Sequence, residues 1–473
     1  MAELLKEMVD DELIPALSYK LEKGTASYIT RRRSATFFAT GSNVYTSSGT
    51  RVIRFNLTGS EWVDPSTIRV MFNVVNKDAT AAHYLRMFSP HGFFSRIRIS
   101  SRGQLLEDIS EANRISEMLK ILNPRWYNKN DEIEGVTTGC GPFTIEHARR
   151  VAAGTLDDLN SFLAGGLEGG KTTTLLFRPC FGLFNQKRYL PLRWLPLQID
   201  LELVNDATAP LYSDDGNFIN TARSIEWQIE DAQIKCDVIE LDGGMTEQFT
   251  DHLQKNGFFQ MSYTTYTSQV QSISGKNVSV NITRAVSFLK RCYISFIKSS
   301  LDDYNDTRFY CKEWNNFYSP LTDGNYGYNT VGIYDKDKDI QSLQVQIGSE
   351  THPEYPIRSS KEAYYHLTKT LPFDDRINSH NLEHHTHSLD IAPRQYFSNK
   401  FIVGIDTEKV HDAAYTAKDL RAGDLLTVKC TFPTVSTDVV TAGTTGRDPD
   451  YMHIVLVHEN VITIRDLGVS VLE

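Results

Sequence analysis

A short stretch of this 473-residue chain occurs twice, about half a chain apart. The first copy, residues 48–58, is SGTRVIRFNLT, and the second copy, residues 274–283, is SGKNVSVNIT. Each begins with a Ser-Gly turn, continues with alternating side chains, and is followed after a short gap by another strand-like run. Because this period is far longer than the roughly 20–50 residues of solenoid repeats, the repeat predicts two copies of one whole β-domain.

The composition fits two sheet-rich domains that bind nucleic acid poorly. Hydrophobic residues make up 40% of the chain, and its 22 tyrosines and 24 phenylalanines favour β-sheets. The formal net charge is −10, and an acidic chain binds nucleic acid poorly unless a local basic patch overrides the average. The best such patch is Arg31-Arg32-Arg33, which we interpret as a solvated run near the terminus. We therefore expect no sequence-specific nucleic-acid binding.

Cysteine usage and the first residues indicate a chain that stays inside the cell in which it is made. Six cysteines are spread without any C-x-x-C pair, which is typical of reduced thiols rather than of a disulfide scaffold or a zinc ribbon. Residues 1–13 carry acids where a secretion signal needs bases and an apolar core. No window approaches the roughly 18 apolar residues of a membrane-spanning helix.

Alternating apolar and polar side chains, separated by Gly, Pro, Asp and Ser clusters, predict about eight strands in each half. In the first half the expected strands are residues 35–40, 52–57, 68–75, 93–100, 104–109, 172–177, 195–203 and 225–238, the last with a β-bulge at Asp231–Ala232. In the second half they are residues 258–265, 278–282, 288–297, 340–347, 401–405, 425–432 and 452–464. Helices are expected at residues 3–22, 112–122 with Ser110 as cap, 246–255 with Thr246 as cap, and 361–370.

This pattern of many strands with few helices predicts an all-β chain of two tandem antiparallel sandwiches or jelly rolls, with short helices and long loops inserted; the family resemblance given below implies two jelly rolls. The turn residues Asp242-Gly243-Gly244 mark the boundary between the halves. We expect an N-terminal arm over residues 1–33, a first jelly roll over 34–241 and a second over 242–473. The longest insertion, residues 299–338, lacks steady periodicity, and a loop of this length inside a compact domain is often functional.

One segment, Gly165 to Thr172, fits the phosphate-binding pattern G-x-x-x-x-G-K-[ST] with Lys171 as its lysine. A phosphate-binding loop follows a strand and opens a helix, because its backbone N–H groups cradle phosphates at the helix N-terminus. Here the order is inverted: residues 157–163 have a helical pattern, and Thr172 begins a β-branched run. We interpret the segment as a glycine-rich turn that enters a strand, and a P-loop NTPase stays an alternative.

A second segment, His380 to His384, fits H-x-x-E-H, the inverted zinc-peptidase pattern, with Glu383 placed as general base. His385 and His387 extend the cluster, while the surrounding Asn, Ser and Thr residues are poor helix formers. We interpret the segment as a histidine-rich surface loop; a zinc hydrolase on a β-rich scaffold stays an alternative, and metal binding is left open. We assign no catalytic, cofactor-binding or metal-ligating residue and expect no enzyme activity.

The chain resembles the double jelly-roll major capsid proteins of tailless icosahedral DNA viruses, especially the polinton-like, virophage and adintovirus-type branch and its larger relatives. The resemblance rests on residues 31–76, 93–109 and 178–203 in the first half and on residues 269–296 in the second. These are patterns over many positions and include no catalytic signature. The resemblance covers residues 34–473, and the arm before Arg31 departs from it most.

The resemblance implies a structural subunit of a virion, assembled inside the host cell. Three chains would form a pseudo-hexameric capsomer of an icosahedral shell, with residues 299–338 in an outward tower. Neighbouring capsomers, penton and minor capsid proteins would be partners, and the N-terminal arm would contact an internal membrane or minor proteins. A β-sandwich carbohydrate-binding or adhesion protein is the remaining alternative, and it would retain glycans as a monomer.

Overall fold

The computed structural model describes residues 28–79, 82–85, 90–122, 167, 169–206, 210–214, 222–255, 257–284, 286, 288–297, 317–318, 320, 342–370, 401–409, 420, 425–432, 449–466 and 468–472. Every strand pairing within these ranges is antiparallel, which confirms the all-β class. The helix expected at residues 3–22 lies outside them, as does most of the loop at 299–338. Residues 29–33 of the expected arm already belong to the first strand.

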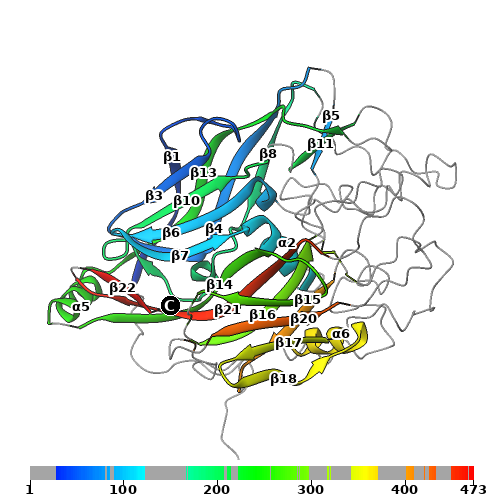
Figure 1. Ribbon diagram of the computed structural model, residues 1–473. Coiled ribbons are helices and arrows are strands. Elements are labelled where there is room, and N and C mark those ends of the chain that lie inside the picture. Colours follow the sequence, from blue (N-terminus) through cyan, green and yellow to red (C-terminus); the bar gives the residue numbers. More distant parts are fainter. Residues whose placement is uncertain are drawn as a thin grey trace, which may run out of the picture.

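The first half forms two facing sheets that join at one long strand, β1 (Figure 1). One sheet has the order β1 (Ile29–Thr40), β13 (Trp227–Leu241), β4 (Trp62–Asn76), β8 (Thr172–Phe177), with β2 (Val44–Tyr45) and β9 (Leu190–Pro191) beside β13 and β4. The other has the order β3 (Val52–Leu57), β10 (Leu197–Leu203), β6 (Phe94–Ser101), β7 (Gln104–Ser110). A small third sheet contains β5 (Ala82–Leu85), β11 (Leu211–Asp214) and β12 (Ala222–Arg223), and two 3-10 turns are η2 (Pro90–Phe93) and η4 (Gly182–Phe184).

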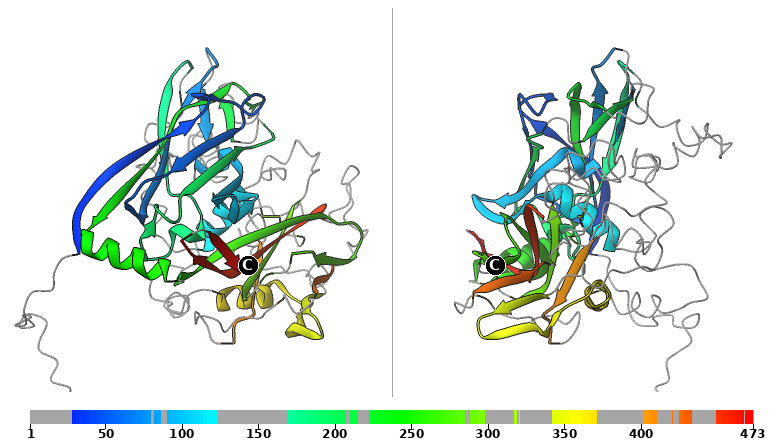
Figure 2. Two further views of the ribbon diagram at one scale, coloured as in Figure 1. Left: turned by 90° about the vertical axis from the view of Figure 1, so that its left-hand side faces the viewer. Right: turned by 45° about the vertical axis from the view of Figure 1, so that its right-hand side comes forward.

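The second half repeats this arrangement. One sheet has the order β14 (Phe259–Ser272), β21 (Tyr451–Ile464), β16 (Leu289–Ile297), β19 (Ile402–Asp406), with β22 (Val469–Leu472) beside β21. The other has the order β15 (Asn277–Ile282), β20 (Leu426–Thr431), β17 (Ser342–Ile347), β18 (Glu350–Ile357). Figure 2 shows the two strand-rich bodies one above the other from two directions.

The strand order makes the two halves equivalent element by element. In each half the first main strand (β1 or β14) lies beside the last (β13 or β21), and the last lies beside the third (β4 or β16). The second main strand (β3 or β15) lies beside the seventh (β10 or β20). This double Greek-key order defines a jelly roll, so the chain is two tandem jelly rolls, as the sequence predicts. The two copies of the repeated segment contain β3 and β15, which are the second main strands of their halves.

Strand alternation builds the core of each sandwich. The inward residues Ile53, Phe55 and Leu57 of β3 are fully buried, while the residues between them reach solvent. Strand β15 has the same alternation. The bulge expected near Asp231 is present, because that residue has φ of 50° and the pairing with β4 shifts there.

The sequence predicts the positions of helices α2, α5 and α6 more accurately than the residues that cap their N-termini. Helix α2 spans Ala112–Leu122 and α6 spans Ser360–Lys369. The first turn of α2 closes through the Ile115 N–H and the Glu111 carbonyl, so Glu111 stands at the cap position predicted for Ser110. Helix α5 spans Gly243–Gln254 and begins earlier than predicted, because the Asp242 side chain accepts a hydrogen bond from the Gly244 N–H at 3.1 Å and replaces Thr246 as cap.

Candidate functional site

The two jelly rolls meet where β7 and β14, each at the end of its sheet, lie against one another. The Tyr263 hydroxyl of β14 donates to the Leu106 carbonyl of β7 at 2.9 Å, and the Ser268 hydroxyl donates to the Ser110 carbonyl at 2.7 Å. Side chains of one strand therefore satisfy backbone carbonyls at the open edge of the other. We call this contact, with α2, η4 and β21 around it, the junction.

Glu107 of β7 is the central acid of the junction, and it is only 2% exposed. Its carboxylate accepts three hydrogen bonds: from the Gly182 N–H at 2.9 Å, the Leu183 N–H at 2.5 Å and the Thr265 hydroxyl at 2.9 Å. Burial raises the pKa of Glu107 to about 7, although the three donors oppose this shift. The carboxylate thus joins β7 to η4 in its own jelly roll and to β14 in the other.

Gly182 allows η4 to approach the second jelly roll this closely. A Cβ atom at this position would lie 1.8 Å from the Thr264 carbonyl oxygen. Only glycine fits without a backbone shift, since such a distance is far inside van der Waals contact.

Arg114 of α2 crosses the junction as a fully buried cation. It donates to the Ser295 hydroxyl at 3.4 Å and to the Phe296 carbonyl at 3.2 Å, both in β16. Its guanidinium carbon lies 4.4 Å from the centre of the Phe317 ring. Burial lowers the pKa of Arg114 to about 9, against the opposing charge of Glu111.

Strand β21 is buried along most of its length, including its polar residues. The Nε2 atom of His458 lies 2.9 Å from the Thr267 hydroxyl, and the Asn460 amide donates to the Leu106 carbonyl at 3.4 Å. Burial lowers the pKa of His458 to about 4 and that of His453 well below its usual value, so both rings are neutral near pH 7. Both faces of β21 are therefore covered by other parts of the protein, as the faces of central strands are.

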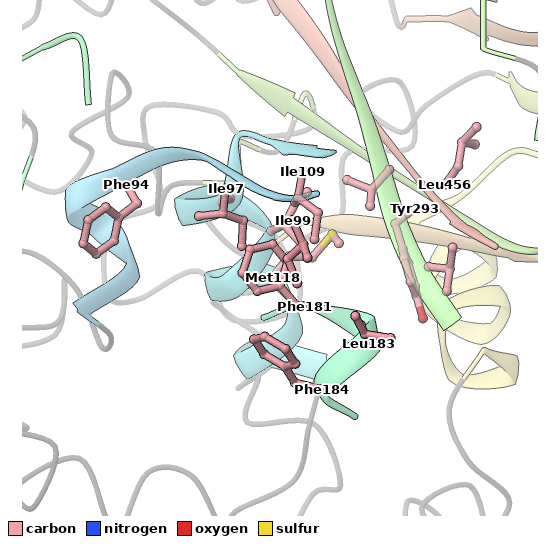
Figure 3. Packing of buried hydrophobic residues seen from close by; sticks show 14 of the residues in the cluster. Phe94, Ile97, Ile99, Ile109, Met118, Phe181, Leu183, Phe184, Tyr293 and Leu456 are labelled. Atoms are coloured by element: carbon pink, nitrogen blue, oxygen red, sulfur yellow. The ribbon is translucent and has the colours of Figure 1, made fainter. Parts of the chain in front are cut away.

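Apolar packing surrounds these polar contacts. Figure 3 shows side chains of β6, β7, α2 and η4 in one cluster with Tyr293 and Leu456 of the second jelly roll. A separate aromatic group links Trp62 and Trp194 to Phe249 of α5 and Phe259 of β14 through edge and tilted contacts of 5.2–6.2 Å. The junction is therefore packed like a domain core and favours a rigid pair of jelly rolls.

The phosphate-binding interpretation of Lys171 is wrong, because Lys171 leads directly into strand β8 and no helix follows it. Its carbonyl accepts from the Asn76 N–H at 2.9 Å, as in a sheet extension. The described residues Gly169, Gly170 and Lys171 thus form a turn into a strand, as the sequence predicts. The histidine cluster His380–His387 lies outside the described residues. Within the described ranges there is no group of His, Cys, Asp or Glu side chains able to hold a metal ion.

The basic run Arg31–Arg33 lies on exposed β1 and is partly engaged in ion pairs. Arg32 contacts Asp64 and Asp237, each at 2.9 Å. Arg33 contacts Glu61 at 2.6 Å. These pairs tie β1 to β4 and β13 and leave little net positive charge for nucleic acid. Among the described residues no helix is long and apolar enough to cross a membrane.

Sequence reasoning missed Glu107 and Arg114, the two buried charges of the junction. Each stands in an ordinary amphipathic pattern, and nothing in the local sequence marks the side on which the second jelly roll lies.

The sequence matches no family profile and no curated protein. The fold, in contrast, is similar to solved virus structures. A chain of the Sputnik virophage structure has a TM-score of 0.58 and 11% identity, over 98% of this chain and 92% of that one. A chain of the PBCV-1 virus capsid has a TM-score of 0.55 and 11% identity, over 96% and 99%. The Faustovirus major capsid protein has a TM-score of 0.55 and 10% identity, over 94% and 92%. The chain therefore has the double jelly-roll fold of viral major capsid proteins.

Proposed function

We propose that this protein is a viral major capsid protein, the structural subunit of an icosahedral shell. The observation that carries the proposal is the duplicated jelly roll held together by a packed junction. Two equivalent sandwiches in one rigid chain let three chains imitate six-fold symmetry, so that one sequence tiles a closed surface. The similarity to capsid chains over nearly their whole length supports the same function.

The chain divides, in this proposal, into an arm before β1 and jelly rolls over residues 29–241 and 242–473, because β1 begins at Ile29 and pairs with β13 from there. The end of β13 at Leu241 and the helix α5 that follows support the second boundary. The protein acts in the virion without catalysis, with other copies of itself as its main partners. Penton and minor capsid proteins are further partners, and the arm contacts the inner side of the shell.

Light scattering and negative-stain images of the purified protein test this function. We expect a stable homotrimer at micromolar concentration, and hexagonal particles or regular arrays in the images. The contact between chains should exceed the about 1,200–2,000 Å² of a standard protein interface. A purified protein that stays monomeric and forms no regular particle would contradict the proposal, and glycan retention by that monomer would favour an adhesion protein.

A further inference from the structure

Because the chain contains two equivalent jelly rolls, the junction between them predicts a second contact of the same kind, formed between two copies of the chain. Inside the chain, β7 and α2 of the first jelly roll lie against β14 and β16 of the second. The equivalent elements are β18 and α6 in the second jelly roll and β1 and β4 in the first. These equivalents belong to opposite ends of the chain's two-domain unit, so they can meet only between two copies.

Burial differs sharply between the equivalent strands. In β14, Met261, Tyr263, Thr265 and Thr267 are buried. No residue of β1, its equivalent, is buried, and its first six residues are all exposed. Strand β1 is also at the end of its sheet over residues 29–38, where it pairs only with β13. An edge of this length with open backbone groups is a site for pairing with another chain.

The elements on the other side of the junction also differ in burial: β7 and α2 of the first jelly roll are more buried than their equivalents β18 and α6 of the second. In β7, Leu106, Glu107 and Ile109 are buried, whereas β18 has a single buried residue, Ile357. Helix α2 is buried nearly all round, whereas α6 exposes Tyr365 to 56%. Within the described ranges, the two most exposed large hydrophobic side chains are Tyr355 of β18, at 78%, and Phe38 of β1, at 70%.

Charge also matches between the two uncovered surfaces. Arg31 on β1 has no ion pair with any described residue, and its side chain is exposed. Strand β18 carries Glu354, which is exposed and has no ion pair within the same ranges. Each strand thus carries one exposed charge, opposite in sign to that of the other strand, and one exposed aromatic side chain, and both kinds of residue are common in protein interfaces.

We propose that β1 and β4 of one copy lie against β18 and α6 of a second copy, as β14 and β16 lie against β7 and α2 within the chain. The contact is head-to-tail, because it joins two different surfaces, and a head-to-tail contact that closes after three copies gives a ring of six jelly rolls. This inference rests on the proposed trimeric capsid subunit and names the surfaces that build it.

Two single substitutions test the contact by light scattering and native mass spectrometry at micromolar concentration. Phe38→Asp damages the β1 surface, and Tyr355→Asp damages the β18 surface. We expect a trimer for the wild type and a monomer for each variant, because each removes one half of every contact. The matched control Ile225→Asp, at a side chain 59% exposed beyond the far end of β13, is expected to stay trimeric.

Mixing the two monomeric variants gives the sharpest result. The intact β18 surface of Phe38→Asp can bind the intact β1 surface of Tyr355→Asp, while the damaged surfaces remain open. We expect one-to-one heterodimers and no larger species. Variants that stay trimeric, or a mixture that contains only monomers, would overturn the head-to-tail contact while a trimeric wild type still supports the proposed function. A wild type that is itself monomeric would overturn both.

Hydrogen exchange on the wild type gives a readout that does not depend on the variants' folding. Alternate N–H groups of β1 point to its unpaired edge. We expect these groups to exchange slowly in the trimer and to exchange faster as the protein is diluted to monomer. Rapid exchange along this edge in the intact trimer would place the contact elsewhere.

Discussion

Replacing Glu107 by glutamine tests whether burial keeps the junction carboxyl group protonated near neutral pH. The side chain is 2% exposed and accepts hydrogen bonds from two backbone N–H groups and the Thr265 hydroxyl. Glutamine keeps the shape but turns one accepting oxygen into a donor. One of the two N–H groups then loses its partner, which costs about 1–3 kcal/mol of unfolding free energy at low pH.

The pH dependence of this cost follows from the pKa of Glu107, which burial raises from 4.5 to about 7. The folded chain binds the proton more tightly than the unfolded chain does. Glu107 therefore contributes its full stability below about pH 4.5, and this contribution is lost as the pH rises through about 7. At about 1.4 kcal/mol per pKa unit, the loss is on the order of 3 kcal/mol.

Urea unfolding of wild type and Glu107→Gln between pH 4.5 and 8, at equal protein concentration, measures this difference. The unfolding free energy of the wild type should fall relative to that of the variant by about 3 kcal/mol over this window. Glu247→Gln, on the exposed side of α5, is the control and should run parallel to the wild type. Parallel curves for Glu107→Gln would refute the raised pKa. A wild type that gains stability with pH would mean that the three donors outweigh burial.

Three further substitutions address the junction and the rejected motif. Gly182→Ala should lower the thermal midpoint, because its Cβ would lie 1.8 Å from a carbonyl oxygen and overpacking costs about 1–3 kcal/mol; Gly468→Ala, with open space around its Cβ, should not. Arg114→Met should also lower the midpoint, because the Ser295 hydroxyl and the Phe296 carbonyl each lose a hydrogen bond, at a cost of about 0.5–1.5 kcal/mol each. Lys171→Ala should change nothing in equilibrium dialysis with ATP, and retention of ATP by the wild type alone would restore the P-loop interpretation.

Strands that face one core and one solvent side were predicted well from the sequence. The bounds of β3 and β8 agree with the expected residues 52–57 and 172–177. Their alternation of apolar and polar residues reflects burial on one side only, so it is fully visible in a single sequence.

Strands at the edge of a sheet, or with both faces buried, were predicted less well. Strand β18 was missed because Pro353 and Pro356 argue against a strand. An edge strand tolerates proline, since the N–H it lacks would point to solvent. Strand β21 was predicted, but its burial was not: the polar residues His453, His458 and Asn460 suggest exposure to solvent, whereas all three are buried.

The adjacent acids Glu107 and Asp108 show why the junction itself lay beyond prediction. Strand geometry turns them to opposite sides of β7. Asp108 pairs with Arg96 of the neighbouring strand at 2.5 and 2.7 Å, while Glu107 points into the second jelly roll. The sequence presents two equal carboxylates, and only the fold shows that one of them lies against η4 and against Thr265, 158 positions away. On the equivalent strand β18, Glu354 and Tyr355 are exposed and have no such neighbour among the described residues, so the same reasoning places their partner in a second copy.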